Sequence, residues 1–178
     1  MRSEKTQSLE RGSAEWYSPP WIFEALQLVF HLDPASPRDG RLPWIPARKC
    51  YTSLQDGLSL AWDGRVWLNP PYGKSLTAWV RRMCDHRDGL ALIPATTDTG
   101  YFHSVMRSAS AVLFFQSRIV FCDRTGRSRG YHPRFASMLA AWGDDCAIAL
   151  YRLVDRGVIV TPLWPRMGRQ PLEQAVTA

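Results

Sequence analysis

The stretch Arg65-Val66-Trp67-Leu68-Asn69-Pro70-Pro71-Tyr72-Gly73 decides how the rest of the chain is interpreted. Its first part is a short apolar run, as in a buried strand, and it ends in a polar residue, two prolines, an aromatic residue and a glycine. Each proline fixes its own φ angle and holds the preceding residue in an extended conformation. The sequence therefore predicts a strand that ends in a stiff loop at Asn69.

This stiff loop is suited to holding a planar group that carries an NH2. The side-chain oxygen of Asn69 and a neighbouring backbone carbonyl supply two hydrogen-bond acceptors, and the ring of Tyr72 supplies a flat face beside them. The alternative is a proline-rich turn with no chemical role, because turn residues commonly follow strands.

Length and composition indicate one globular domain with a substantial core. The chain has 178 residues, of which 46% are hydrophobic and 21% are charged. No apolar run approaches the ~20 residues of a membrane span, and the polar start of the chain has no signal-peptide core, so we expect a cytoplasmic protein without membrane contact. The net charge of +6 favours a polyanionic partner.

The four cysteines, Cys50, Cys84, Cys122 and Cys146, are widely spaced and have no histidine pattern near them. This spacing indicates reduced, mostly buried thiols, and it predicts neither a metal site nor a disulfide framework.

The first part of the chain is expected to hold a helix and a strand that ends in an acidic residue. Ser18 is a natural N-cap, and apolar residues at helical spacing predict a helix over residues 19–30. The next predicted strand ends at Asp33 and is followed by a turn. Nucleotide-type cofactors bind at such strand ends, at the edge of an α/β sheet. An ordinary turn at Asp33 is the alternative, because the glycines that allow close backbone approach to a cofactor are missing.

Alternating strands and helices predict an α/β sheet in the second half of the chain. Helices are predicted over residues 75–84 and after the cap residue Thr99, and strands over residues 50–52, 89–93, 111–115 and 158–160. Residues 136–142 and 146–151 are expected to pair as an antiparallel hairpin around Gly143-Asp144-Asp145.

Residues 117–134 contain five arginines against one acidic residue, interleaved with glycines and flat rings. Arginine can bridge phosphates or fork onto guanine, and a ring can pack against an extruded base. We therefore predict a loop that contacts nucleic acid, with a merely solvated loop as the alternative. The predicted contacts are Arg118, Phe121, Arg124, Arg127, Arg129 and Tyr131.

Several motifs, taken in order, resemble the phage-type DNA N-6-adenine methyltransferase (Dam-like) family, which depends on S-adenosylmethionine. They are Leu32-Asp33-Pro34-Ala35, Lys49-Cys50-Tyr51-Thr52, Asp56-Gly57-Leu58, the Asn69-Pro70-Pro71-Tyr72 loop, Leu92-Ile93-Pro94-Ala95-Thr96-Thr97-Asp98, Arg118-Ile119-Val120-Phe121 and Phe135-Ala136-Ser137-Met138-Leu139. The resemblance covers about residues 14–142.

This resemblance implies a compact Rossmann-like α/β methyltransferase fold, with a mostly parallel sheet and the C-terminal antiparallel hairpin. It also implies site-specific transfer of a methyl group from S-adenosylmethionine to the exocyclic amine of a flipped adenine in double-stranded DNA. Asn69 and the Pro70 carbonyl would orient the amine, Pro71 would complete the catalytic loop, and Tyr72 would stack on the base. The implied cofactor-binding residues are Trp16, Tyr17, Ser18, Pro19, Asp33, Pro34, Asp56 and Asn69.

The expected organisation is a disordered tail over residues 1–13, a methyltransferase domain over 14–162 that includes the DNA-contacting loop, and a weakly ordered tail over 163–178. Two other functions fit the same motifs. One is a methyltransferase that acts on RNA or on a protein glutamine, and the other is a relative that binds DNA without catalysis.

Overall fold

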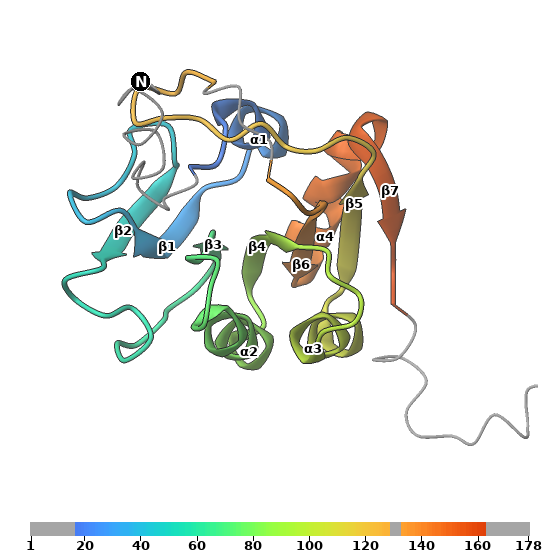
Figure 1. Cartoon of the computed structure of the whole chain (residues 1–178), viewed down its shortest axis with the longest axis horizontal. Coiled ribbons are helices and arrows are strands. Elements are labelled where there is room, and N and C mark those ends of the chain that lie inside the picture. The colour runs from blue at the N-terminus through green and yellow to red at the C-terminus, as the bar shows by residue number, and fades with distance from the viewer. Residues whose placement is uncertain (1–16, 129–132, 163–178) are drawn as a thin grey trace, which may run out of the picture.

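The computed structural model describes residues 17–128 and 133–162. Its strands are β1 (Phe30–Ser36), β2 (Ala47–Thr52), β3 (Val66–Leu68), β4 (Gly89–Pro94), β5 (Ala111–Phe115), β6 (Ser137–Trp142) and β7 (Gly157–Val160). Its helices are α1 (Pro20–Leu26), α2 (Leu76–His86), α3 (Gly100–Ser108), α4 (Asp144–Leu150) and the 3-10 helix η3 (Tyr151–Arg156). The strands form one sheet in the order β2-β1-β3-β4-β6-β5-β7 (Figure 1).

Helices cover both faces of this sheet, so the molecule has three layers and two apolar clusters. α2 and α3 pack on one face, and α1, α4 and η3 pack on the other (Figure 1). Alternate residues of β4 serve the two clusters: Leu90 and Leu92 face α1 and α4, whereas Ala91 and Ile93 face α2 and α3. All six residues of β4 are buried, which explains its unbroken apolar sequence.

The sheet is only half parallel, which corrects the predicted mostly parallel sheet. The pairs β1–β2, β1–β3 and β3–β4 are parallel, whereas β4–β6, β5–β6 and β5–β7 are antiparallel. The parallel half carries the sequence motifs at Asp33, on β1, and at Asp56 and Asn69, in the loops after β2 and β3. The antiparallel half supports this half through β4.

The strand order reverses around β1, and this reversal places the candidate site. The chain leaves β1 to form β2 on one side and then crosses to form β3 on the other side. The loops that follow β1 and β3 therefore diverge at the carboxyl edge and leave a crevice between them, where open α/β sheets bind ligands.

The first helix begins and ends differently from the prediction over residues 19–30. Its N-cap is Pro19 and not Ser18, and it ends at Leu26 because Gln27 adopts a left-handed conformation with φ of 50°. The apolar residue Phe30, which continued the helical spacing in the sequence, begins β1 instead.

The predicted hairpin over residues 136–151 is wrong in its second half. Residues 137–142 form β6 as expected, but Gly143, with φ of 84°, leads into α4 rather than into a β-turn. Asp144 and Asp145 lie in the first turn of α4, where negative charge stabilises a helix. Residues 146, 149 and 150 are buried at helical spacing. Most of the strand predicted over residues 146–151 is therefore part of a helix.

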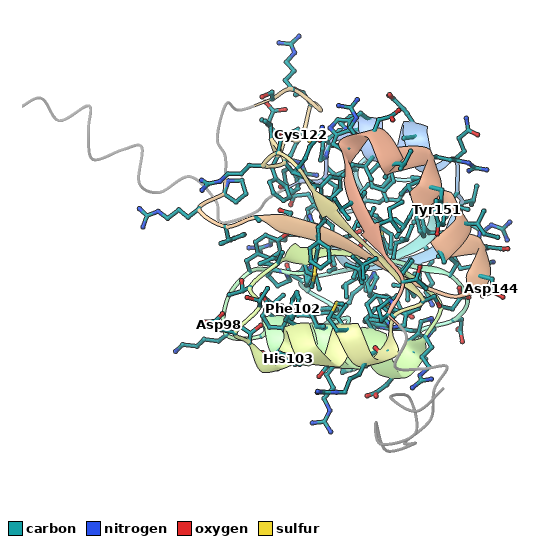
Figure 2. The ribbon with its side chains drawn as sticks, turned by 90° about the vertical axis from the view of Figure 1, so that its right-hand side faces the viewer. Asp98, Phe102, His103, Cys122, Asp144 and Tyr151 are labelled. Carbon is teal, nitrogen blue, oxygen red and sulfur yellow. The ribbon has the colours of Figure 1, made fainter. Side chains whose placement is uncertain are left out.

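Other predictions in the second half are confirmed. The helix over residues 76–86, the strands over 89–94 and 111–115, and the last short strand are present, and the Thr99 side chain accepts a hydrogen bond from Phe102 N as the cap of α3. Phe102 points from α3 toward the sheet, whereas His103 lies exposed on the outer side of the helix (Figure 2).

The four cysteines are free thiols, and three of them are buried, as expected. None of the described helices is long and apolar enough to cross a membrane. Among residues 17–128 and 133–162, no group of three or more His, Cys, Asp or Glu side chains is placed to hold a metal ion. The predicted tails, residues 1–13 and 163–178, lie outside the described residues.

Candidate active site

A cavity of about 300 Å³ lies at the carboxyl edge of the sheet, where β1 and β3 end. Its wall combines four segments that are far apart in the chain: the residues before α1, the end of β1 with the loop after it, the loop after β2, and the loop from β3 into α2. The lining residues include Tyr17, Ser18, Asp33, Pro34, Ser36, Leu42, Ile45, Asp56, Gly57, Leu58, Trp67, Asn69, Pro70, Pro71, Tyr72 and Trp79.

The Asn-Pro-Pro-Tyr loop forms one side of this cavity. β3 is buried along its whole length and ends directly before Asn69, so the strand fixes where the loop begins. Asn69 is partly buried, Pro70 is buried and Pro71 is exposed. All four loop residues line the cavity.

Tyr72 is held firmly by its surroundings. Its hydroxyl donates to the carbonyl of Leu92 at 3.3 Å, and its ring meets Phe135 and Phe121 edge to face, with ring centroids 5.4 and 6.2 Å away. Burial raises the pKa of the Tyr72 hydroxyl far above its usual range, so the phenol stays protonated and keeps this hydrogen bond. The ring is therefore a fixed wall of the cavity.

Asp33, on β1, places a buried carboxyl group in the wall of the cavity. The residue is 2% exposed, Ala35 N donates to its Oδ1 at 3.2 Å, and the Ser36 hydroxyl donates to its Oδ2 at 2.5 Å. Burial raises the pKa of Asp33 from 3.8 to about 6, although the two hydrogen bonds oppose the shift. The pairing of β1 with β2 shifts register between Asp33 and Ser36, an irregularity that is common next to binding sites.

Gly57 provides the close backbone approach for which glycines are missing after Asp33. A Cβ atom at this position would lie 2.0 Å from the carbonyl oxygen of Pro34 and 3.0 Å from the ring of Trp79. Asp56 and Gly57 lie in a turn: Asp56 has φ of 51°, and its Oδ1 accepts from Leu58 N at 3.3 Å. The glycine thus closes the loop after β2 onto the end of β1.

Replacing Gly57 by alanine is therefore expected to push this loop away from Pro34. We expect a loss of about 1–3 kcal/mol in the free energy of unfolding, from overpacking, together with weaker ligand binding in the cavity. Thermal unfolding of Gly57→Ala measures the first effect. Gly100→Ala is the matched control, because a Cβ there meets nothing within 4 Å. Equal melting temperatures for the two variants would contradict the role given to Gly57.

The segment before α1 closes another side of the cavity. Tyr17 and Ser18 are buried, and Tyr17 O accepts from Cys122 N at 3.0 Å. Buried polar atoms of two lining residues, Ser18 Oγ and Trp67 Nε1, have no hydrogen-bond partner within the described part of the chain. Such atoms suit a polar ligand. Pro19 caps α1 and does not line the cavity, and Trp16 lies outside the described residues.

The arginine-rich segment crosses the molecule from β5 toward the chain that precedes α1 (Figure 1). Arg118 Nη1 donates to the carbonyl of Pro133 at 3.1 Å, and Arg124 forms an ion pair with Asp39 at 3.1 Å. Arg127 is exposed, and its backbone N–H donates to Asp123 Oδ1 at 3.2 Å. These three arginines are thus at the surface, two of them already engaged with the protein.

Phe121 does not occupy the exposed position that a contact with DNA requires. It is 2% exposed and belongs to the apolar cluster that contains α1, where it packs edge to face against Tyr72. This burial does not fit the predicted contact of Phe121 with DNA. Arg129 and Tyr131, the other two predicted contacts, lie outside the described residues.

Sequence reasoning missed two aromatic residues at the site. Phe135 packs against Tyr72, and the indole N–H of Trp44 donates to the carbonyl of Ser18 at 2.9 Å. Both belong to irregular segments without periodicity, so only the folded arrangement reveals their partners. Trp44 also lies next to the Gly126 turn of the arginine-rich segment.

Taken together, the fold and the cavity define an α/β protein in which a buried acidic residue and the Asn-Pro-Pro-Tyr loop line one ligand-sized cavity at the strand ends. The sequence model of the DNA N-6-adenine-methyltransferase (Dam) family matches residues 5–144. The chain therefore belongs to this family of DNA adenine methyltransferases. No curated protein and no solved structure matched the chain.

Proposed function

We propose that this protein transfers a methyl group from S-adenosylmethionine to the N6 amine of an adenine flipped out of double-stranded DNA. The observation that carries the proposal is that the Asn-Pro-Pro-Tyr loop and the buried carboxyl group of Asp33 line the same cavity. The reversal of strand order beside this cavity supports a Rossmann-like methyltransferase domain, which we assign to residues 14–162.

The cavity residues fit S-adenosylmethionine in size and chemistry. Asp33 offers a carboxylate for the positively charged amino group, and Asp56 offers an acceptor for the adenine amine on the adjacent wall. The polar atoms of Ser18 and Trp67 that have no partner within the described residues can bind further groups of the cofactor. When bound, the cofactor supplies an electrophilic methyl group on a sulfonium.

The catalytic loop acts by positioning and by accepting hydrogen bonds. The amine of adenine is a poor nucleophile because its lone pair is delocalised into the ring. Hydrogen bonds from both amine hydrogens, to Asn69 Oδ1 and to the Pro70 carbonyl, let the nitrogen become tetrahedral and turn its lone pair toward the methyl group. Tyr72 holds the base by stacking, and its anchored hydroxyl keeps the ring in place.

The base must leave the duplex for this chemistry, because its amine is paired and stacked between neighbours. Unstacking costs a few kcal/mol, which contacts between basic side chains and phosphates offset. Arg118, Arg124 and Arg127 lie on the segment that pairs through Cys122 with Tyr17, a lining residue of the cavity, and they are assigned this role together with Arg129 and Tyr131.

The decisive experiment combines purified protein, isotopically labelled S-adenosylmethionine and mixed-sequence duplex DNA. The DNA is digested to nucleosides and analysed by mass spectrometry. Label in N6-methyldeoxyadenosine, absent with Asn69→Ala, is the expected result. Label in methylcytosine would mean that the methyl acceptor is cytosine and not adenine. No label in DNA, despite measurable cofactor binding, would favour the methyltransferases that act on RNA or on a protein glutamine, and DNA binding without cofactor binding would indicate an inactive relative.

Arg127 offers a direct test of the DNA-contacting segment. Arg127→Gln is expected to weaken duplex binding about three- to tenfold at physiological salt and to reduce the salt dependence by about one counterion, because one phosphate contact is lost. Fluorescence anisotropy at several salt concentrations measures both quantities. Arg107→Gln, which removes an exposed arginine from α3, is the control. An unchanged salt slope would remove Arg127 from the DNA interface.

A further inference from the structure

The loop between β2 and β3 depends on side chains of α2 for its shape. Residues 53–65 contain no helix or strand, yet Asp56, Gly57 and Leu58 line the cavity. A loop of this length needs external anchors to hold a binding wall in one position. The structure provides them in a cluster of Arg82, Trp62 and Trp79.

Arg82 forms two hydrogen bonds with the backbone of this loop. Its Nη1 donates to the carbonyl of Leu58 and its Nη2 donates to the carbonyl of Leu60, while the guanidinium lies over the ring of Trp62, 4.9 Å from the centroid. The two donors of a planar guanidinium match two carbonyls in fixed geometry, which the point charge of a lysine cannot do.

Trp62 adds a third backbone contact and connects the loop to the cavity wall. Its indole N–H donates to the carbonyl of Gly57 at 2.8 Å. Its ring stacks on Trp79 with centroids 6.1 Å apart, and Trp79 itself lines the cavity. The carbonyls of residues 57, 58 and 60 are thus all held from α2 or from the ring that α2 supports.

α2 also carries the catalytic loop, because Leu76, its first residue, follows Tyr72 by only four positions. One rigid helix therefore fixes the Asn-Pro-Pro-Tyr loop through its amino-terminal end and the cofactor wall through Arg82. This arrangement sets the distance between the amine-accepting loop and the wall that carries Asp56.

We propose that Arg82 is a positioning residue: through the carbonyls of Leu58 and Leu60 it fixes the Asp56–Leu58 wall and thereby sets the affinity for the adenosine half of S-adenosylmethionine. The inference rests on the proposed function, because it takes this wall to be the adenosine subsite. Arg82 itself does not line the cavity and acts only through the loop.

The test compares Arg82→Lys with Arg81→Gln, which removes an exposed charge from the neighbouring position of α2. Calorimetry measures the Kd of S-adenosylmethionine and of 5′-methylthioadenosine, a probe that lacks the amino-acid portion. Arg82→Lys is expected to weaken the binding of both compounds about tenfold, because two charge-assisted hydrogen bonds to the loop lose their geometry. The kcat at saturating cofactor should change less than about threefold, and Arg81→Gln should match the wild type.

Two further variants separate positioning from a general loss of stability. Trp62→Phe keeps the stacked ring but removes the hydrogen bond to Gly57, so it should weaken the same two compounds to a smaller extent. In the background of Asp56→Asn the effect of Arg82→Lys on Kd should shrink, because both act on one wall.

Unchanged affinity for both compounds in Arg82→Lys overturns the inference. The inference is also overturned if the effects of Arg82→Lys and Asp56→Asn on Kd are additive. A lower melting temperature of Arg82→Lys, with an unchanged Kd at temperatures well below that melting temperature, overturns it as well. Failure of the wild type to bind either compound overturns the proposed function, and the inference falls with it.

Discussion

Replacing Asn69 by alanine is expected to lower kcat for DNA methylation by about a hundred- to a thousandfold, the usual cost of losing one preorganised group that acts in the transition state. In the proposed mechanism, Asn69 accepts a hydrogen bond that strengthens only as the amine becomes tetrahedral. Its loss should therefore appear in kcat more than in the affinity for either substrate. Steady-state kinetics with saturating cofactor and DNA measure the first quantity, and calorimetry measures cofactor binding.

The matched control for this prediction is Thr77→Ala. Thr77 is exposed in the first turn of α2, directly after the catalytic loop, so the variant reports on general disturbance of this region. It should keep nearly wild-type kcat and melting temperature. An Asn69→Ala variant with kcat within threefold of the wild type would contradict the proposed role of Asn69 in activating the amine. A variant that merely binds cofactor a hundredfold more weakly would reassign Asn69 to the cofactor site.

The position of the Asn-Pro-Pro-Tyr loop could be predicted from the sequence because its geometry is local. Proline sterics fix Asn69 and Pro70 without help from distant residues, and the apolar run before them predicts the buried strand that positions them. The strand at residues 89–94 and the helix over 76–86 are equally local, since each shows its period directly in the sequence.

The errors arose where tertiary contacts decide the structure. Residues 146–151 form a continuous apolar run in the sequence, which fits a strand or a helix over so short a range, and only the packing of α4 against the sheet decides between them. Phe121 sits among arginines in the sequence but is buried against Tyr72 in the fold. Composition describes a segment as a whole, whereas burial is decided one side chain at a time.

The roles of Gly57 and Arg82 could not be predicted because both depend on contacts across the chain. Gly57 reads as an ordinary turn residue until Pro34 is brought against it. Arg82 reads as a solvated helix residue until residues 58–62 fold over its side chain. The sequence did reveal Asp33, but its burial, and the raised pKa that results, belong to the folded chain.

Asp33→Asn is expected to weaken S-adenosylmethionine binding at pH 7.5 by about thirtyfold or more, because the proposed site then loses a buried charged partner for the cofactor's amino group. In the wild type, affinity should fall as the pH drops below about 6, where the free protein protonates Asp33. The affinity of the Asn variant should stay nearly flat over the same range. Calorimetric titrations between pH 5 and pH 8 measure both profiles, and Asp85→Asn, an exposed position on α2, is the charge control.

The same substitution should make the protein without cofactor more stable, which is the opposite of its effect on binding. Because the pKa of Asp33 is raised from 3.8 to about 6 in the folded state, the stability that its proton contributes is complete below about 3.8 and is lost as the pH rises through 6. At pH 7.5 the ionised group therefore costs up to about 3 kcal/mol, at 1.36 kcal/mol per pKa unit. Asparagine removes this cost but weakens the hydrogen bond from Ser36, so we expect a net gain of about 1–2 kcal/mol in the free energy of unfolding.

Urea unfolding at pH 7.5 and at pH 4.5, without cofactor, tests this expectation. The advantage of Asp33→Asn should be large at pH 7.5 and shrink at pH 4.5, where wild-type Asp33 is protonated in the folded state. A variant that is less stable at both pH values would mean that the carboxylate is held mainly by hydrogen bonds and is not strained by burial. A more stable variant that no longer binds cofactor would instead identify Asp33 as a residue kept charged for binding at the expense of the fold.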